Sequence, residues 1–483
     1  MNPAEEPKPL WTVETMAAAM RAGRQGALPA SVHGISIDTR SIVPGEAFFA
    51  IKGDSRDGHD FVDAALASDG IAVIARDRHA QFAADAPLLL VDDVLDGLRD
   101  LGRAARARSQ ARIVAVTGSV GKTGTKEALR LALSADGETH ASVASYNNHW
   151  GVPLTLARFP AGAKYGVFEI GMNHAGEITP LTQMVRPHVA IVTTIEPVHL
   201  EYFGSLEAIA DAKAEIFTGL EPGGAAVLNR DNAQFERLAA AAVAAGVGRI
   251  VSFGEHPSAD VHARRIHLHP DGSVVDAVIL GEEITYKLGA PGRHQATNSL
   301  AVLAAVVLSG ADLALAALAL AQLQPPVGRG ARLSLEMPGG GSALLIDESY
   351  NANPASMRAA IALLAQASVG LRGRRIAVLG DMLELGPQSP ALHAGLAAAL
   401  VEANIDLVFC AGPLMRALFE TLPSIRQGGY AETSAGLESV LVSTLRAGDV
   451  VMIKGSLGSK MGPVVKALTR AFPVSAAAED APA

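Results

Sequence analysis

The chain has 483 residues, of which 49% are hydrophobic and 4% aromatic, and its formal net charge is −9 at pH 7. This length exceeds a single typical core, so we expect two to four domains of about 100–200 residues each. The acidic balance argues against a nucleic-acid-binding protein, which normally carries a basic domain or stripe.

The first nine residues are acidic and rich in proline. They contain no apolar segment followed by a small-residue cleavage site, so they do not resemble a signal peptide. The chain also lacks a run of about 18 uninterrupted apolar residues, the length that spans a membrane. We therefore expect a cytoplasmic protein with no membrane span.

Residues 1–108 are predicted to form a small α/β domain. Helices are expected at 60–66 and 99–108, the second leading to the next domain. The segments with a strand-like pattern are 35–40, 46–51, 71–75 and 88–91. Polar turns at 38–40 and 53–59 suit a phosphorylated or sugar ligand, although a solvated turn is an equally good interpretation.

Residues 113–126 contain a phosphate-binding loop signature. A β-branched run suits a buried parallel strand, and Gly118 and Gly121 then let backbone N–H groups converge on phosphate oxygens. Lys122 would meet the β- and γ-phosphates, Thr123 would hold Mg²⁺, and the next helix N-terminus would favour the anion. Two residues separate the glycines, whereas the common Walker pattern has four, which narrows the class of ATP enzyme. A glycine-rich turn without a ligand is the structural alternative.

Residues 109–325 are predicted to form the nucleotide domain, a parallel sheet whose strands alternate with helices. Its strands are expected near 113–117, 166–170, 189–194, 225–228 and 249–253. Ligands collect at the carboxyl ends of such strands, so Lys122, Thr123, Glu169 and His199 are expected in one crevice. Glu169 and His199 are candidate ligands of a second metal ion, since Mg²⁺ takes carboxylates and waters. An N-cap carboxylate and a surface histidine are the alternative interpretations.

Two later segments of this domain carry polar residues whose roles stay open. A helix is predicted at 205–217, and its apolar positions leave Lys213 on a partly polar face, which predicts a solvated lysine. A glycine-proline turn at 288–299 precedes a long Ala/Leu helix. His294 and Asn298 at the start of that helix would touch a base or a phosphate, or would simply cap the helix.

Residues 326–483 have the pattern of a dinucleotide fold, with strands expected at 343–347, 375–379, 406–410 and 449–454. Polar loops follow these strands at 347–354, 380–386 and 454–460. The predicted fold class is therefore α/β with three domains, of which the central one is a parallel-sheet P-loop ATPase domain and the C-terminal one is Rossmann-like.

Several segments, taken together, resemble one known family. They are 117–123, 147–153, 169–178, 199–201 with Lys213, 347–354, 380–386 and 454–456. They resemble the Mur ligases of peptidoglycan synthesis, and within that family the MurF type. The sequences Asn-Asn-His-Trp-Gly-Val-Pro at 147–153 and Gly-Asp-Met-Leu-Glu-Leu-Gly at 380–386 are similar to that type. The Asp-Asn-Pro-Arg signature of diaminopimelate-adding relatives is missing.

The resemblance implies an ATP-dependent ligase that forms an amide bond. It would add D-alanyl-D-alanine to UDP-N-acetylmuramoyl-tripeptide through an acyl phosphate, giving the UDP-linked pentapeptide, ADP and phosphate. Residues 1–108 would bind the UDP-sugar, 109–325 would bind ATP, and 326–483 would close on ATP and bind the amine. Its cofactors would be ATP and two Mg²⁺ ions, its partners these small molecules alone, and we expect a monomer.

The resemblance also implies roles for single residues, with Lys122, His199 and Lys213 catalytic. The implied ATP contacts are Thr117, Gly118, Ser119, Val120, Gly121, Lys122, Thr123, Asn298, Arg329, Asp347 and Tyr350. The implied metal ligands are Thr123, Glu169, His199 and Lys213. Lys213 matches a lysine that several relatives carry as a carbamate, which turns a cation into a Mg²⁺-binding anion.

Two further groups of residues are implied by the same resemblance. The UDP-sugar peptide would contact Thr39, Arg40, Asn147, Asn148 and His149. Asp381 and Glu384 would lie near the amine pocket, where either is a candidate base for the amine.

Two other interpretations stay open. A folylpolyglutamate synthetase uses a similar loop and amide ligation, but it would not need the 108 residues before the loop with their turns at 38–40 and 54–56. A nucleotide switch without ligase turnover would explain the loop but not the polar clusters that end so many other strands. Strict dependence of ATP turnover on both a UDP-peptide and an amine would exclude the switch.

Overall fold

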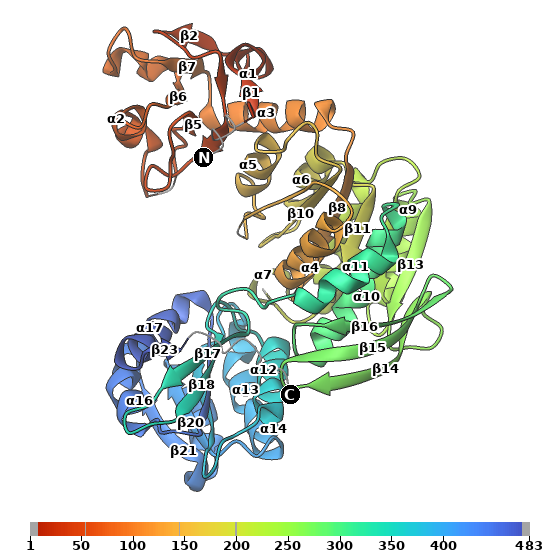
Figure 1. The fold of residues 1–483 in the computed structure, drawn as a ribbon, viewed down its shortest axis with the longest axis vertical. Helices are drawn as coiled ribbons and strands as arrows, with labels where there is room; N and C mark the ends of the chain where they lie inside the picture. Colours follow the sequence, from red (N-terminus) through yellow and green to blue (C-terminus); the bar gives the residue numbers. More distant parts are fainter. Residues whose placement is uncertain (1–7, 54, 144, 199, 476–483) are drawn as a thin grey trace, which may run out of the picture.

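The computed structural model of the protein describes residues 8–53, 55–143, 145–198 and 200–475. They form three α/β units in chain order, each around its own main sheet, and Figure 1 shows these units from the red N-terminal end to the blue C-terminal end. The predicted α/β class with three units is confirmed. Among the described residues, no helix is long and apolar enough to cross a membrane.

The N-terminal unit has a five-stranded sheet of order β2-β7-β6-β5-β4, and β1 pairs with β3 beside it. The predicted strand at 35–40 is shorter than expected because a polar turn, closed by Asp38, replaces its second half. The elements are β1 (Trp11–Thr12), α1 (Val13–Met20), β2 (Gly23–Gln25), β3 (Ser31–Val32), β4 (Gly34–Ser36), β5 (Glu46–Phe49), α2 (Val62–Leu66), β6 (Ile71–Ala75), β7 (Leu88–Val91) and α3 (Val94–Arg108).

The central unit has a nine-stranded sheet of order β16-β15-β14-β13-β12-β11-β8-β10-β9. The strands from β9 to β13 are parallel, as predicted. They and their helices are β8 (Arg112–Thr117), α4 (Lys122–Ser134), β9 (Thr139–Ala141), α5 (Gly151–Ala157), β10 (Tyr165–Glu169), α6 (Ile178–Val185), β11 (Val189–Val192), α7 (Leu200–Phe203), α8 (Leu206–Ala214), β12 (Ala225–Asn229), α9 (Phe235–Ala244) and β13 (Arg249–Gly254).

An antiparallel extension completes this sheet, and no strand was predicted there. It consists of β14 (Val261–His269), β15 (Gly272–Ile279) and β16 (Glu282–Leu288), followed by α10 (Arg293–Leu308) and α11 (Leu313–Ala319). Buried and more exposed residues alternate along β15, a period-two pattern typical of a sheet with one solvated face. A search for continuous apolar runs does not detect such strands.

The C-terminal unit has a seven-stranded sheet of order β21-β20-β19-β22-β18-β17-β23. The predicted strands are found as β18, β19, β20 and β22, whereas β17, β21 and β23 toward the edges were not predicted. The elements are β17 (Ala331–Glu336), β18 (Ser342–Glu348), α12 (Pro354–Gln366), β19 (Arg375–Gly380), α13 (Ser389–Ala394), α14 (Leu396–Glu402), β20 (Leu407–Ala411), α15 (Arg416–Thr421), β21 (Gln427–Ala431), α16 (Glu438–Thr444), β22 (Val450–Lys454), α17 (Gly462–Ala471) and β23 (Val474–Ser475).

One apolar core joins the N-terminal unit to a face of the central sheet. Helix α3 packs on α5 there, and in Figure 1 it lies between the two units. The buried indole of Trp11 donates to the carbonyl of Ala157 at 2.8 Å, and the guanidinium of Arg108 lies 3.4 Å from the centre of its ring. The C-terminal unit has two core clusters of its own, one on each face of its sheet.

Candidate active site

A cleft of about 610 Å³ lies between the carboxyl ends of the central strands and the C-terminal unit. The sheet order places the ends of β10, β8, β11 and β12 side by side on the central wall. The predicted site residues that line the cleft are Ser119, Val120, Gly121, Lys122, Thr123, Asn147, Glu169, Asn298, Arg329 and Tyr350. The rule that ligands collect at strand ends therefore located this cavity from the sequence.

The loop between β8 and α4 needs glycine at both predicted positions. Gly118 has φ +144° and Gly121 has φ +88°, in the region that side chains disfavour. A Cβ on Gly121 would lie 2.6 Å from Nδ2 of Asn298, and one on Gly118 would collide with the hydroxyl of Thr193. Helix α4 begins at Lys122 with no side-chain cap, so its first backbone N–H groups are available to an anion.

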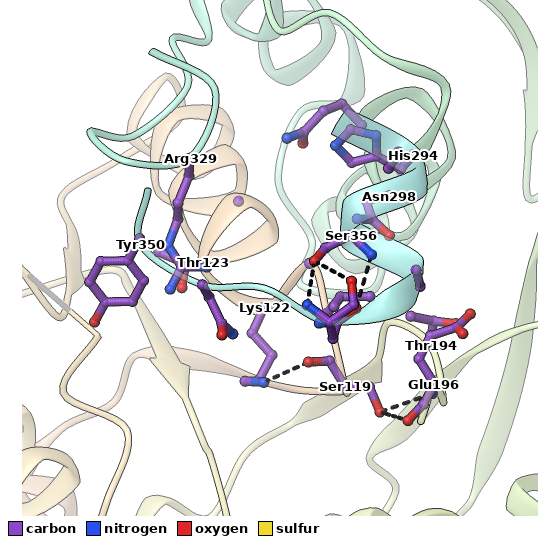
Figure 2. A pocket seen from close by; sticks show the side chains of 18 of the residues that line it. Ser119, Lys122, Thr123, Thr194, Glu196, His294, Asn298, Arg329, Tyr350 and Ser356 are labelled. Atoms are coloured by element: carbon purple, nitrogen blue, oxygen red, sulfur yellow. Dashed lines mark hydrogen bonds between the residues drawn. The ribbon is translucent and has the colours of Figure 1, made fainter. Parts of the chain in front are cut away.

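The ammonium of Lys122 lies against the loop that precedes it (Figure 2). Its Nζ donates to the carbonyl of Gly118 at 2.6 Å and lies 3.4 Å from that of Ser119. Burial lowers the pKa of Lys122, and the cation of Arg329 lowers it further, whereas Glu169 acts in the opposite direction. An anionic ligand in the cleft would stabilise this ammonium, which is the role expected of a phosphate-binding lysine.

Glu169 ends β10 and brings three predicted residues together. Its carboxylate is 2% exposed and accepts hydrogen bonds from Oγ1 of Thr123 at 2.9 Å and from Nδ2 of Asn147 at 2.7 Å. A hydroxyl and a carboxylate beside a phosphate-binding loop form a donor set that fits Mg²⁺, which usually takes one or two protein carboxylates with phosphate oxygens and waters. His199, predicted at the same site, lies outside the described residues.

Lys213 is buried at 1% exposure, so the prediction of a solvated lysine was wrong. It lies in the last turn of α8, whose inward residues join the core. Desolvation lowers the pKa of Lys213 far below its ordinary value, and the charge of Lys122 adds to this effect. The charged form of this amine is therefore disfavoured, a property that the apolar pattern of the helix did not reveal.

The opposite wall of the cleft comes from the C-terminal unit. The guanidinium of Arg329 lies 4.3 Å from the centre of the Tyr350 ring, and both side chains line the cavity that Figure 2 shows. Nζ of Lys454 donates to Glu348 at 3.1 Å, and both residues line the cavity. Stacked and paired in this way, these long side chains present a polar surface opposite the phosphate loop.

Two predicted nucleotide contacts of this region differ in their positions. Asn298 and its neighbour His294 line the cavity from the start of α10, and burial lowers the pKa of His294. Asp347 is buried, and its carboxylate accepts the backbone N–H of Ser349 at 3.0 Å. It therefore shapes the turn after β18 and does not line the cleft.

Polar residues after β11 and β12 also line the cleft, although they were not predicted as site residues. They are Thr194, Glu196, Asn229, Asp231 and Asn232. Burial raises the pKa of Glu196, and the cation of Arg358 in α12 opposes this shift. The strand-end rule that located Glu169 could have found them, because each lies at the end of a strand predicted at 189–194 or 225–228 or within four residues after it.

The predicted UDP-sugar residues lie mostly outside the cleft. Arg40 is exposed and pairs with Asp38 at 2.6 Å, and hydrogen bonds from Arg40 lower the pKa of Asp38 to about 2. Thr39 lies between them and is half-buried. Asn148 and His149 are exposed at the start of α5, where Oδ1 of Asn148 accepts the N–H of Gly151.

The predicted amine-pocket residues follow β19, outside the cavity lining. Asp381 is buried, its carboxylate accepts the N–H of Met415 at 2.8 Å, and burial raises its pKa. Glu384 lies nearer the central unit, because its carbonyl accepts the N–H of Glu201 in α7 at 3.5 Å. Glu384 is therefore at the contact between the last two units, whereas Asp381 is bonded within the C-terminal unit.

Three family descriptions match successive parts of the chain. "Mur ligase family, catalytic domain" matches residues 31–109, "Mur ligase middle domain" matches 116–306, and "Mur ligase, glutamate ligase domain" matches 335–457. Together they cover all three units of the structure.

Full-length relatives show the same similarity. A UDP-N-acetylmuramoyl-tripeptide--D-alanyl-D-alanine ligase of Escherichia coli (strain K12) is 35% identical, over 90% of this chain and 93% of the relative. The crystal structure of MurF from Acinetobacter baumannii has a TM-score of 0.81 at 29% identity, covering 96% and 100% of the two chains. The MurF ligase of Thermotoga maritima in complex with ADP has a TM-score of 0.73 at 25% identity, covering 91% and 97%.

Proposed function

This chain belongs to the Mur ligase family, and from that premise we propose that it joins D-alanyl-D-alanine to UDP-N-acetylmuramoyl-tripeptide, with conversion of ATP to ADP and phosphate. The product is the UDP-linked pentapeptide, a precursor of peptidoglycan. The observation that carries this proposal is the cleft in which Lys122, Thr123 and Glu169 face Arg329 of the C-terminal unit. Similarity to UDP-N-acetylmuramoyl-tripeptide--D-alanyl-D-alanine ligases over at least 90% of the chain argues against a folylpolyglutamate synthetase.

The reaction has two covalent steps. A peptide carboxylate is a poor electrophile, so it first attacks the γ-phosphorus of ATP, and ADP leaves as an acyl phosphate forms. The amine of D-alanyl-D-alanine then attacks the acyl carbon, loses a proton, and the phosphate leaves as the amide bond forms. Closure of the C-terminal unit over the cleft would keep water from the acyl phosphate, which would otherwise hydrolyse.

The residues of the loop bind and orient the phosphates of ATP. The ammonium of Lys122 exchanges the carbonyl of Gly118 for phosphate oxygens, and the N-terminus of α4 stabilises the same charge. Arg329 reaches the phosphates from the opposite wall, while Asn298 and Tyr350 contact the adenosine. Asp347 supports the turn that carries Tyr350.

Two Mg²⁺ ions belong to this proposal. Thr123 and Glu169 would hold one, and Glu169, His199 and Lys213 would contribute to the second site. Bound Mg²⁺ neutralises charge on the phosphate oxygens. Asn147 keeps the Glu169 carboxylate in one orientation through its hydrogen bond.

Lys213 is proposed to carry a carbamate. Burial lowers the pKa of its amine, which favours the neutral form that attacks CO₂. The neutral amine nitrogen bonds to the carbon of CO₂, one proton leaves to solvent, and a carbamate anion replaces the neutral amine. After incubation with ¹³C-bicarbonate, a ¹³C NMR signal of the carbamate carbon should be present in the wild type and absent in Lys213→Arg. Absence of this signal from both proteins would overturn the proposed carbamate.

The remaining roles follow the division of the chain at 108/109 and 325/326. The N-terminal unit binds the UDP-sugar through Thr39 and Arg40, and Asn148 and His149 meet the peptide. Arg40→Ala should raise KM for the UDP-substrate and leave KM for ATP unchanged. Asp381 and Glu384 remain the candidate bases for the amine, and we place the enzyme in the cytoplasm, as a monomer.

The deciding experiment measures phosphate release from Mg-ATP with UDP-N-acetylmuramoyl-tripeptide, with and without D-alanyl-D-alanine, and the mass of the product. Release that requires both substrates and gives the pentapeptide is expected. Release without the dipeptide would point to another amine or to a switch-like ATPase. No release with any substrate of this family would overturn the proposal.

A further inference from the structure

The phosphate loop is held against the end of β11 by hydrogen bonds from Thr193, a fully buried residue that does not line the cleft. Its hydroxyl lies 2.6 Å from the carbonyl oxygen of Val120 and 3.3 Å from that of Thr117. Its backbone N–H also donates to the carbonyl of Thr117 at 3.0 Å. A strand that contributes no charged group to the loop therefore fixes two of the loop's carbonyl groups.

These bonds determine which backbone groups of the loop face the cleft. The C=O and N–H of one trans peptide point in opposite directions, and the described residues contain no cis peptide bond. The carbonyl of Val120 points at Thr193, so the N–H of Gly121 in the same peptide points away from β11, toward the cleft that Gly121 lines. By the same reasoning, the Thr117 carbonyl turns the N–H of Gly118 away from β11.

The peptide between Gly118 and Ser119 has the opposite orientation. Its N–H donates to the carbonyl of Thr194 at 2.8 Å, and its carbonyl accepts from Nζ of Lys122 at 2.6 Å. The hydroxyl of Ser119 donates to the backbone carbonyl of Glu196 at 3.0 Å and accepts the backbone N–H of Glu196 at 3.0 Å, as Figure 2 shows. Ser119 is therefore tied to the segment after β11, and its amide is not available to a phosphate.

We propose that Thr193 is a positioning residue for phosphoryl transfer, because its hydroxyl holds the Val120–Gly121 peptide with its N–H, and not its C=O, toward the β-phosphate of ATP. This inference rests on the proposed binding of ATP by the loop. A carbonyl turned toward a phosphate would repel it, whereas converging N–H groups attract it. The loop has only two residues between its glycines, so it depends on the neighbouring strand for this geometry.

The test compares affinities for ADP and AMP in three variants of the full chain. Thr193→Val keeps the shape of the side chain but removes the hydroxyl, and Thr193→Ser restores it. Thr182→Val is the matched control, because Thr182 is equally buried and donates to the carbonyl of Ile216 at 2.8 Å, outside the cleft. Calorimetry should show ADP binding weakened about tenfold in Thr193→Val, with Thr193→Ser and Thr182→Val near wild type.

AMP provides the readout that a merely structural role would not change, because it lacks the β-phosphate. Its affinity should be the same in all variants. Equal losses of ADP and AMP binding in Thr193→Val, or unchanged ADP binding in that folded variant, would overturn the proposal. Thr193→Ala repeats the test if Thr193→Val does not fold. If the wild type showed no ligase turnover, only the proposed function would be overturned. The ratio of ADP affinity to AMP affinity does not depend on ligase turnover.

Discussion

The two interfaces of the central unit differ in kind. Toward the N-terminal unit it shares one continuous apolar core, with Trp11 bonded to Ala157 across the boundary. Toward the C-terminal unit it presents a polar cleft, and that unit keeps two separate cores of its own. The first interface resembles the interior of a domain, whereas the second resembles a contact between independent bodies.

This difference indicates how the work of a ligase is divided. Separating the first two units would expose apolar surface, so they are expected to move as one body. The C-terminal unit can separate from the cleft without exposing its cores, so the domain closure of the proposed mechanism belongs to this interface. Removing a side chain at the cleft to the C-terminal unit should therefore mainly lower activity. Removing one from the core shared with the N-terminal unit should mainly lower stability.

The largest expected effect is on activity, at the polar cleft. Lys122→Ala should lower kcat about a thousandfold, since it removes a charge that stabilises the transferring phosphoryl group. The melting temperature of the variant should change little, because Lys122 is only partly buried and lies outside the apolar cores. Coupled ADP-release kinetics and calorimetry would measure both. Near-normal turnover in this variant would contradict the assignment of the site.

The next effect is on stability, at the apolar interface. Trp11→Ala should lower the free energy of unfolding of the first two units by about 3–5 kcal/mol, through loss of a buried aromatic side chain. Trp11→Phe is the matched control that keeps an aromatic ring but loses the bond to Ala157. Urea denaturation followed by circular dichroism would measure the loss. A loss in Trp11→Ala below that of Trp11→Phe would show that the two units do not share a core.

Acid should weaken the central unit by an intermediate amount. Burial lowers the pKa of His140 and of His188 to about 4 in the folded state. The unfolded chain then binds more protons than the folded chain between pH 6.5 and 4, so stability falls as the pH falls through that window. Both histidines are partly exposed, so solvent screening reduces the loss well below the full linkage value, and we expect about 2 kcal/mol.

His188→Gln tests the acid prediction, because an amide oxygen can replace the ring nitrogen that accepts the N–H of Ile113. Its unfolding free energy should depend less steeply on pH between 7.5 and 4.5 than that of the wild type. Urea titrations at several pH values would measure the slope, and identical slopes would show that His188 is protonated equally in both states.

The smallest effect is expected for the ion pair between the last two units. Nη1 of Arg332 donates to Asp271 at 2.9 Å, but the Asp271 side chain is 91% exposed. The coupling energy of this pair, measured with Arg332→Ala, should therefore be less than about 1 kcal/mol. A double-mutant cycle with Asp271→Asn would isolate the pair. A coupling energy as large as the stability loss expected for Trp11→Ala would contradict the proposed difference between the two interfaces.

The predicted parts of the fold are those with a strong local pattern. Buried parallel strands such as β8 are continuous β-branched runs, so their positions agree with the structure to within a few residues. The antiparallel extension β14–β16 has one solvated face, and its alternating pattern was not recognised. Its place in the sheet depends on pairing with β13, which local sequence does not encode.

For the site, the loop signature and the strand-end rule predicted that Lys122, Thr123 and Glu169 lie together, and all three line the cleft. Lys213 shows what a helical pattern misses, because its environment comes from elements distant in sequence. The role of Asp347 also depended on a hydrogen bond to its own turn, which only coordinates reveal. Thr194 and Glu196 after β11 went unpredicted because His199 alone was singled out in that loop, and no site residue was assigned to the end of β12.

The indole of Trp11 also constrains the order in which the newly made protein folds. Its hydrogen-bond partner, Ala157, is translated 146 residues later. Domains generally fold as they emerge from the ribosome, the N-terminal one first. Here the first unit waits with the apolar side of α3 uncovered until α5 has left the exit tunnel. We expect the nascent chain to need protection from aggregation during that interval, and a fragment ending at residue 108 to aggregate.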